Sequence, residues 1–361
     1  MKILFVSGNL CDGGAQRVIA VVASALAEKG HDVHLLLYSR NEKEYPISKL
    51  VQIESLANNY NEYTKLSSLE RVFRIRKIIG LLKPDIGIGF LEGGYGLYIS
   101  SMGLGLPKIA SARIKPDVIM KAKGLRGKID RLWFSHADAV VLQNEEQAEQ
   151  APTKLWRNCT VIPNPASPKA LQAKPCIHDA VKRIVMVGRL ADQKNYEMII
   201  DAMKIVHREY PDVVVDIFGK GNKEKALKEK IKVAGLSNTI NLRGWTQNAI
   251  EEYADSDLYI LTSDYEGMPN SLLEAMAVGI PCISTSCETG PKEMIDNGIN
   301  GFLVPVKDVN ALATCITDII KMPKHIRESI GWNAKNTVKA KYTEQIIANK
   351  WEELLFSVVR R

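Results

Sequence analysis

Two glutamates eight residues apart form the most distinctive chemical pattern of the chain. Glu266 lies in a loop rich in Gly, Pro and Asn, and Glu274 falls in the first turn of a predicted helix that ends near Gly279. Carboxylates accept hydrogen bonds from sugar hydroxyl groups, and the N-terminal end of a helix attracts phosphates. A structural explanation is equally open, because Ser271-Leu-Leu-Glu274 fits a capping box and Glu266 fits a solvated loop residue.

A pair of cations follows the first predicted strand of the second half of the chain. Gly188 at the end of that strand permits close approach of the backbone to a ligand, and Arg189 and Lys194 come shortly after it. Arginine offers phosphate oxygens a fork of N–H donors and lysine offers a point charge, so the two residues suit a diphosphate. The alternative is a pair of solvated loop residues.

Two adjacent glycines occupy the equivalent turn in the first half of the chain. Gly13 and Gly14 lie between the first strand and the first helix, where a dinucleotide-binding fold has its phosphate turn. The turn is either a tight connection or a place where the backbone approaches a ligand, and the paired glycines favour a ligand. The spacing is not GxGxxG, and the end of the second strand, Leu36-Leu-Tyr-Ser-Arg40, carries no acidic residue, so an NAD site is disfavoured.

Positive charge is concentrated in the first half. The chain has 48 basic and 41 acidic residues, a net charge of +7; residues 1–165 carry 22 and 16 (+6), and residues 166–361 carry 26 and 25 (+1). Apolar residues alternate with the basic ones, as in segments that lie on an anionic membrane, although a solvated helix face would have the same pattern. Two such clusters in one domain favour the membrane, and the third option, nucleic acid, has none of its motifs here. The two basic clusters are Arg71, Arg74, Arg76 and Lys77, and Arg113, Lys115, Lys121, Lys123, Arg126, Lys128 and Arg131.

Short β-rich runs alternate with helical patterns in both halves, which predicts an α/β protein with two doubly wound parallel sheets. We expect a first domain at 1–165, a second at 166–344, and a proline-containing linker over Asn164–Asp179. A cleft between the carboxyl ends of the two sheets would hold the ligands. The expected strands are Lys2–Ser7, 31–38, 84–90, 108–112, 137–142, 161–162, Arg183–Val187, 213–218, 239–242, Leu258–Leu261 and 281–284, and a last helix is expected over 345–359.

Cysteine usage and hydropathy indicate a reducing compartment. The six cysteines form no CxxC pair and no zinc-site spacing, so we expect buried thiols. The apolar N-terminus suits a first strand better than a signal peptide, and no run of 18 apolar residues occurs. Asp255-Ser-Asp257 precedes a strand and is interpreted as a turn, leaving no candidate metal site. A cytoplasmic protein is expected.

The order and spacing of these motifs resemble the family-4 retaining glycosyltransferases over essentially the whole chain. That family has the GT-B fold, in which two Rossmann-like domains face a central cleft, and the resemblance implies a C-terminal helix (about 345–361) that crosses back to the first domain. The matching segments are Gly13–Ala15, Gly188-Arg189-Leu190 with Gln193-Lys194-Asn195, the E-x7-E from Glu266 to Glu274, Gly279-Ile280-Pro281, Gly290–Ile295, and Gly298 with Asn300–Pro305.

The resemblance implies a role for each matching residue. Arg189 and Lys194 would hold the donor diphosphate, Glu266 the hydroxyls of the donor sugar, and Glu274 the ribose. The other residues of the implied donor site are Gly13, Gly14, Gly188, Gly267, Met268, Asn270 and Ser271. The catalytic set would be Glu266, Arg189 and Lys194. The donor would be a nucleotide sugar, UDP-linked by family frequency, with no metal or other cofactor required because the two cations supply the positive charge.

The acceptor side departs from the family pattern. Several relatives carry a histidine in the loop where this chain has Arg113, an always-charged side chain that cannot act as a base, so its role stays open. The loops carrying Glu92 and 113–131 would border the acceptor. The resemblance implies a glycan acceptor linked to polyprenyl diphosphate, and a protein peripheral on the cytoplasmic face of the inner membrane. The alternatives are a nucleotide-sugar 2-epimerase on the same fold and a non-catalytic nucleotide- or membrane-binding module.

Overall fold

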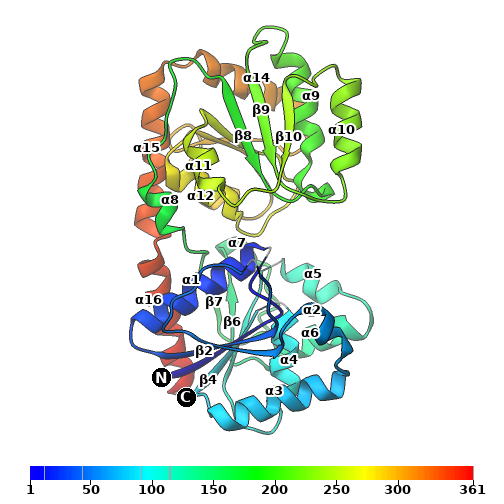
Figure 1. The fold of residues 1–361 in the computed structure, drawn as a ribbon. Helices are drawn as coiled ribbons and strands as arrows, with labels where there is room; N and C mark the ends of the chain where they lie inside the picture. The colour runs from blue at the N-terminus through cyan, green and yellow to red at the C-terminus, as the bar shows by residue number, and fades with distance from the viewer. Residues whose placement is uncertain (12, 43, 91, 114, 361) are drawn as a thin grey trace. The chain divides into compact units, whose positions relative to one another are not determined.

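The computed structural model describes residues 1–11, 13–42, 44–90, 92–113 and 115–360, and the chain divides into two compact units (Figure 1). Unit 1 comprises Met1–Pro165 with Glu344–Arg361, and unit 2 comprises Ala166–Thr343. The side chains of Glu92 and Arg126, both expected on the acceptor side, lie outside the described part of the structure. Each unit consists of one parallel sheet packed between helices.

Unit 1 has a seven-stranded sheet in the order β3-β2-β1-β4-β5-β6-β7, with every recorded strand pairing parallel. The strands are β1 (Lys2–Ser7), β2 (Asp32–Ser39), β3 (Gln52–Ala57), β4 (Ile86–Phe90), β5 (Lys108–Ser111), β6 (Ala139–Leu142) and β7 (Cys159–Val161). The helices are α1 (Gly14–Glu28), α2 (Tyr60–Lys65), α3 (Ser68–Leu82), α4 (Glu92–Ser100), α5 (Pro116–Lys121), α6 (Gly124–His136), α7 (Glu145–Glu149) and α16 (Glu344–Val359).

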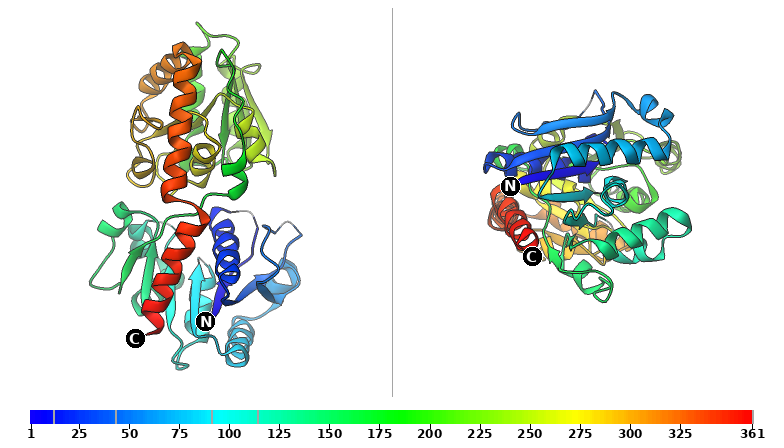
Figure 2. Two further views of the ribbon diagram at one scale, coloured as in Figure 1. Left: turned by 90° about the vertical axis from the view of Figure 1, so that its left-hand side faces the viewer. Right: turned by 90° about the horizontal axis from the view of Figure 1, so that it is seen from below.

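The side chains of β1 alternate between the two faces of the sheet and contribute to both cores of unit 1. Successive side chains of a strand point to opposite faces, so Ile3 and Phe5 enter the core covered by α1 and α16. Leu4 and Val6 enter the opposite core, beneath α3, α4 and α6. The helix α16 lies alongside α1 (Figure 2). It inserts the fully buried Trp351, which stacks on Phe90 at 6.0 Å between ring centroids.

Unit 2 has a six-stranded sheet in the order β10-β9-β8-β11-β12-β13, again with parallel pairings. The strands are β8 (Arg183–Val187), β9 (Val214–Phe218), β10 (Ile240–Gly244), β11 (Leu258–Leu261), β12 (Cys282–Thr285) and β13 (Phe302–Val304). The helices are α8 (Pro168–Gln172), the 3-10 turn η1 (Asp192–Lys194), α9 (Tyr196–Val206), α10 (Glu224–Val233), α11 (Ala249–Ala254), α12 (Asn270–Val278), α13 (Pro291–Met294), α14 (Val309–Lys321) and α15 (Lys324–Lys341).

Strand order explains where each sheet can bind a ligand. In unit 1 the order reverses between β1 and β4, and in unit 2 between β8 and β11, so the connections from these neighbouring strands leave toward opposite faces. Open α/β sheets bind ligands at the carboxyl ends of the strands at such a switch point. The turn carrying Gly13 and the turn carrying Gly188 both follow a strand at this position, β1 and β8 respectively.

Several expectations about the elements are corrected by the structure. The edge strands β3 and β13 were not predicted; β3 is only partly buried and β13 has three residues. Most of the expected linker Asn164–Asp179 packs onto unit 2, because α8 lies within it and Ala166 and Ala170 are fully buried in a core cluster there. The expectation of buried thiols is wrong for Cys176, which is exposed, while Cys159 and Cys315 are half-buried. None of the described helices combines the length and apolarity needed to cross a membrane.

Candidate active site

Lys194 and Glu266 meet at the carboxyl edge of the unit 2 sheet. Lys194 ends the 3-10 turn that follows β8, and Glu266 lies in the loop that follows β11, the neighbouring strand. The Lys194 Nζ atom lies 2.6 Å from Glu266 Oε1, and the two side chains are 16% and 8% exposed. The expectation that Glu266 is a solvated loop residue is therefore wrong, and the two motifs come together as one charged pair.

Hydrogen bonds fix Glu266 from both its carboxylate and its backbone. The Ser263 hydroxyl donates to the same Oε1 atom at 2.6 Å, and the Thr289 hydroxyl donates to the Glu266 carbonyl oxygen. Gly290 has φ +93°, and a Cβ there would lie 2.0 Å from the Gly267 carbonyl oxygen. The loop that carries Gly290 approaches the loop that carries Glu266 so closely that only a residue without a side chain fits at position 290. This contact between the loops helps to orient Glu266.

The loop carrying Lys194 is tied to the loop carrying Glu266 along its length. The Thr262 hydroxyl donates to the Lys194 carbonyl oxygen at 2.8 Å, and Gln193 Nε2 donates to the Tyr265 carbonyl oxygen at 2.8 Å. Asn195 adopts the left-handed conformation (φ +45°) and donates from Nδ2 to Asp264 Oδ1 at 2.8 Å. The position of the lysine relative to the glutamate is therefore set by the two loops together.

Arg189 differs from Lys194 in having no fixed partner. It is exposed, directly after Gly188, and no described side chain forms an ion pair with it. The backbone of Gly188 lies close to that of Gly219, because a Cβ on Gly219 would lie 1.8 Å from the Gly188 carbonyl oxygen. A Cβ on Gly188 would lie 3.3 Å from Lys194 Cε, so the turn that carries Arg189 passes close to the lysine side chain. An exposed guanidinium without an ion pair can accept an anionic ligand without breaking an existing bond.

Glu274 lies on α12, whose N-terminus is not the predicted capping box. The helix begins at Asn270 with Pro269 as the N-cap residue and no side-chain cap, which places Ser271 at the second helical position. The Ser271 hydroxyl instead accepts a hydrogen bond from the Tyr259 hydroxyl at 2.8 Å. Glu274 is 8% exposed and accepts a hydrogen bond from the Tyr253 hydroxyl at 3.2 Å. Glu274 is thus held by a neighbouring helix rather than used to cap its own.

The remaining residues expected at the donor lie on the same loop and helix. Gly267 and Met268 follow Glu266 directly, Met268 is buried, and Asn270 opens α12. Sequence reasoning missed Ser263, Thr289 and Tyr253. Ser263 stands three residues before Glu266 and was detectable as part of the same loop, whereas Tyr253 reaches Glu274 from α11 and had no local signal.

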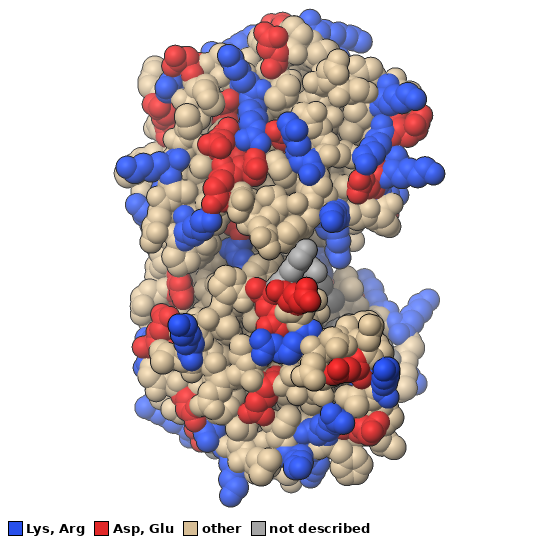
Figure 3. All heavy atoms as spheres, in the orientation of Figure 1, with Lys and Arg blue, Asp and Glu red and all other residues tan. Residues whose placement is uncertain are grey.

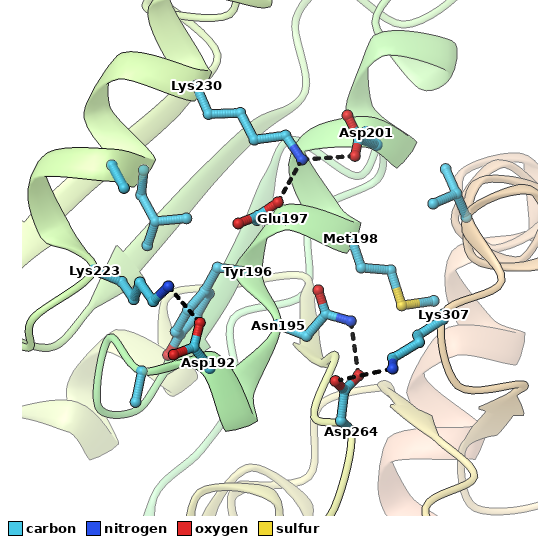
Figure 4. Close-up of a pocket in the computed structure, with 14 residues that line it drawn as sticks. Asp192, Asn195, Tyr196, Glu197, Met198, Asp201, Lys223, Lys230, Asp264 and Lys307 are labelled. Atoms are coloured by element: carbon cyan, nitrogen blue, oxygen red, sulfur yellow. Dashed lines mark hydrogen bonds and ion pairs between the residues drawn. The ribbon is translucent and has the colours of Figure 1, made fainter.

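A separate pocket of about 370 Å³ lies beside η1 and the start of α9 (Figure 4). Its lysines are neutralised by carboxylates: Lys223 pairs with Asp192, Lys230 with Glu197 and Asp201, and Lys307 with Asp264. Neither Lys194 nor Glu266 lines it. We place the candidate active site at the Lys194–Glu266 pair and not in this pocket.

In unit 1, Gly13 and Gly14 form the beginning of α1. Gly13 is its N-cap residue in extended conformation, without a side-chain cap, and a Cβ there would lie 2.2 Å from Gln16 Oε1. The turn follows β1 at the switch point of the sheet, where backbone N–H groups at a helix N-terminus favour an anion.

The two basic clusters of unit 1 differ in how their side chains are used. On α3, Arg74 donates to the Leu56 carbonyl oxygen, Arg76 to the Ser100 and Met102 carbonyl oxygens, and Arg71 to the Tyr63 carbonyl and hydroxyl oxygens. The arginines of this cluster thus tie the elements of unit 1 together. In the second cluster, Arg131 likewise donates to the Met120 and Ala122 carbonyl oxygens. Lys121 on α5, Lys123 just before α6 and Lys128 on α6 are exposed, and Lys121 forms an ion pair with Asp117 at 2.5 Å.

Comparison with solved structures identifies the fold. Sucrose-phosphate synthase from Thermosynechococcus elongatus superposes with a TM-score of 0.83 at 16% identity, covering 99% of both chains. Anabaena HepE, solved in complex with UDP and glucose, gives a TM-score of 0.79 at 19% identity, covering 99% of this chain and 100% of that one. The chain has the GT-B fold of two Rossmann-like domains, which confirms the expected fold class.

Family models and curated relatives then identify the family. The model described as Glycosyltransferase Family 4 matches residues 12–170, and the model described as Glycosyl transferases group 1 matches residues 169–337. The amylovoran biosynthesis glycosyltransferase AmsD of Erwinia amylovora is 26% identical, covering 98% of this chain and 99% of the relative. A Campylobacter jejuni alpha-1,4-N-acetyl-D-galactosaminyltransferase, whose name specifies an undecaprenol-diphosphate-linked acceptor, is 26% identical over 99% of both chains. The chain belongs to the family-4 glycosyltransferases, and its function is glycosyl transfer.

Proposed function

We propose that this enzyme moves a sugar from a nucleotide-diphosphate donor, UDP-linked, to a glycan acceptor with retention of configuration. The single observation that carries the proposal is the Lys194–Glu266 pair at the switch point of unit 2. It is supported by a fold shared with a protein solved in complex with UDP and glucose.

Each charged group of the site has a place in this proposal. Arg189 and Lys194 bind the diphosphate and stabilise the negative charge that develops as the bond from the sugar C1 to the phosphate oxygen breaks. Glu266 receives the hydroxyls of the donor sugar, and Glu274 the ribose hydroxyls. The positive charges of Arg189 and Lys194 stabilise the negative charge of the departing diphosphate, so we infer that no metal ion is required.

The surroundings of Glu266 support a positioning role over a nucleophilic one. Its Oε1 atom already accepts hydrogen bonds from Lys194 Nζ and Ser263 Oγ, which lowers the electron density available for attack on the sugar. In the proposed reaction the acceptor oxygen bonds to C1 on the face from which the phosphate leaves. The electron pair of the broken bond goes to the phosphate oxygen, which takes the acceptor proton.

Variants of the charged pair test the proposal. We expect Lys194→Ala and Glu266→Gln each to lower the rate of sugar transfer by about 100-fold or more, because each removes a group aimed at the donor. The measurement is UDP release with a polyprenyl-diphosphate-linked glycan, after a screen of nucleotide sugars for thermal stabilisation. Lys223→Ala is the matched control, since Lys223 is a paired lysine of the same unit outside the site.

Wild-type turnover in both site variants would refute the proposed site. The anomeric configuration of the product, read by NMR, tests retention separately, and an inverted product would contradict it. Turnover that persists with a chelator is expected, and its complete loss would contradict the inference about metal.

We further propose a lipid-linked acceptor and peripheral attachment to the cytoplasmic face of the inner membrane, in the assembly of a bacterial surface polysaccharide. The support is a surface on α5 and α6 that mixes exposed apolar and basic side chains. Val118, Leu125 and Leu132 are 52%, 75% and 48% exposed, and Lys121, Lys123 and Lys128 lie among them in the sequence. Figure 3 shows lysine and arginine side chains projecting from this part of unit 1. We call these six residues the α5–α6 surface.

A further inference from the structure

The carboxyl edge of the unit 1 sheet holds a cluster of buried polar side chains that the proposed donor site does not use. Arg113 follows β5, Gln143 follows β6, and Asn164 lies shortly after β7. These three strands are neighbours and run parallel, so the residues after them meet at one edge. Asn164 Oδ1 accepts hydrogen bonds from Arg113 Nη1 at 2.7 Å and from Gln143 Nε2 at 3.1 Å.

The guanidinium of Arg113 is held in place without a counter-charge. It lies over the Phe90 ring, 4.6 Å from the centroid, and no carboxylate of the described residues forms an ion pair with it. Its Nε and Nη2 atoms are buried, and within the described chain they have no hydrogen-bond partner. Burial lowers the pKa of Arg113 to about 9. A cation with buried, unpartnered N–H groups and no counter-charge is costly, and an anion would relieve that cost.

The two unpartnered atoms are the ones that recognise oxyanions. Nε and Nη2 form the side of the guanidinium whose two N–H bonds point the same way, which matches the two oxygens of a carboxylate or phosphate. Arg40 of the same unit shows this geometry, because its Nε and Nη2 donate to Glu44 Oε1 and Oε2 at 2.9 and 2.7 Å. In Arg113 the third nitrogen, Nη1, is already used by Asn164, which aims the Nε–Nη2 side.

Neighbouring atoms of the cluster extend the site beyond a single charge. Gln143 Oε1 and Ser111 Oγ are also buried and without a described partner. Gln143 is oriented by its own bond to Asn164, and Ser111 is the last residue of β5. A ligand with a hydroxyl group beside its oxyanion would satisfy these atoms as well as the guanidinium.

From these observations we propose that Arg113, Gln143 and Asn164 form a binding site for an oxyanion carried by a substrate, either a carboxylate of an acidic sugar or a phosphate. The proposal rests on the proposed glycosyl transfer and adds a specificity for anionic substrates. Arg113 binds the oxyanion directly, and Asn164 is a positioning residue that orients the guanidinium.

Binding of small anions to the full-length protein tests the site apart from the donor site. The probes are D-glucuronate and inorganic phosphate, with D-glucose as the neutral counterpart, titrated by calorimetry at fixed ionic strength and saturating UDP. Saturating UDP fills the proposed donor site at Arg189 and Lys194, so the anions cannot bind there. Binding of UDP is measured in a separate titration, and its absence would count against the proposed function and not against the Arg113 site. We expect the wild type to bind at least one of the two anions, and Arg113→Gln to weaken that binding about 30-fold or more while UDP affinity stays unchanged.

Lys77→Gln is the matched control, because it removes one positive charge from unit 1 at an exposed position, and its anion affinity should equal that of the wild type. A loss confined to glucuronate identifies a carboxylate ligand, a loss confined to phosphate identifies a phosphate ligand, and a loss of both supports a shared oxyanion site. Equal anion affinity in Arg113→Gln and the wild type, or no binding of either anion by the wild type, overturns the proposal.

A measurement on the wild-type protein tests the site even if Arg113→Gln does not fold. The Arg113 Nε–Hε resonance in the NMR spectrum, assigned with Arg113→Lys, should shift on titration with the anion that binds and stay unmoved with D-glucose. An unmoved resonance at saturating anion would overturn the proposal, whatever the stability of Arg113→Gln.

Discussion

Lys194 and Glu266 illustrate how little a close ion pair says about stability. Their charged atoms lie 2.6 Å apart with both side chains largely buried, and the cost of removing two charges from water offsets most of the attraction between them. Ser263 and the neighbouring loops add hydrogen bonds that hold the pair at one edge of the sheet. Under the proposed function this arrangement is preorganisation, in which the ammonium group is held where the proposed diphosphate would bind.

Tyr253 positions Glu274, the second glutamate of the proposed donor site, through a hydrogen bond from its hydroxyl. Tyr253→Phe removes the hydroxyl that donates to Glu274 Oε2, so the carboxylate loses one fixed contact inside a buried site. We expect the KM for the nucleotide sugar to rise about tenfold, because a hydrogen bond to a charged group contributes about 1.5–3 kcal/mol. The measurement is steady-state kinetics with the donor varied.

Tyr342→Phe serves as the control, since it removes another buried tyrosine hydroxyl of unit 2, one that faces the Glu293 carbonyl oxygen. Its KM should match the wild type. An equal rise in both variants, or no rise in Tyr253→Phe, would contradict the role given to Tyr253.

Elements with a strong local pattern were predictable, and those decided by long-range pairing were not. The strands Lys2–Ser7, Arg183–Val187 and Leu258–Leu261 have the predicted bounds, because buried parallel strands are continuous apolar runs. The edge strands β3 and β13 are short or half-exposed and lack such a run. Adjacency of β8 and β11, which brings Lys194 to Glu266, depends on strand order and cannot be read from local sequence.

The start of α12 shows why a motif can mislead. Ser271 and Glu274 have capping-box spacing, but Pro269 precedes the helix and shifts its first residue to Asn270. The serine then falls inside the helix, where its hydroxyl pairs with Tyr259. The spacing of the two residues matched the motif, but the position of the helix start decided which interaction formed.

Arg113 shows a limit of a different kind. Its presence in place of a histidine is visible in the sequence, whereas the buried Nε and Nη2 atoms without partners are visible only in the structure.

The turn between α11 and β11 supplies a stability prediction with a defined pH dependence. Asp257 is fully buried and accepts hydrogen bonds at 2.9–3.0 Å from the backbone N–H groups of His178, Lys182 and Arg183 and from the His178 ring. Burial alone would raise the pKa of Asp257, but these bonds outweigh it and hold the pKa below its usual range. The carboxylate therefore anchors the segment that leads into β8, and the Asp-Ser-Asp sequence is a turn, as predicted.

Asp257→Asn should lower the free energy of unfolding at pH 7 by about 2 kcal/mol, because an amide cannot accept all of these bonds. A carboxyl whose pKa is lowered by folding stabilises the protein above its unfolded pKa of about 3.9 and loses that stabilisation as the pH falls through the lowered value. The difference between wild type and variant should therefore shrink below about pH 4. Urea unfolding at several pH values measures it, with the exposed Asp255→Asn as control. A difference that is constant with pH would contradict this account.

At the scale of the molecule, the chain crosses between its two units twice, after Pro165 and after Thr343. The second crossing places α16 on unit 1, where Ile347, Trp351 and Leu355 complete the core under α1. Excess positive charge lies in residues 1–165, with +6 of the total +7, and the structure divides it into bonded arginines on α3 and exposed lysines on α5 and α6. The lysines of the α5–α6 surface belong to the exposed part of this surplus, as does Lys77 of α3.

That surface carries the last prediction, on attachment to membranes. Replacing Lys121, Lys123 and Lys128 together with Gln should weaken binding to phosphatidylglycerol vesicles by about 3 kcal/mol at low salt, because each lysine near an anionic surface contributes about 1 kcal/mol. Leu125→Ser should weaken binding to the same vesicles, since this 75% exposed side chain would enter the lipid interface. The control replaces Lys225, Lys228 and Lys232, three exposed lysines of α10 in unit 2, with Gln. Co-sedimentation at several salt concentrations separates the charge effect from the apolar one. Equal binding by the two triple variants would contradict a role of the α5–α6 surface in membrane attachment. That result would leave the proposed Lys194–Glu266 site unaffected.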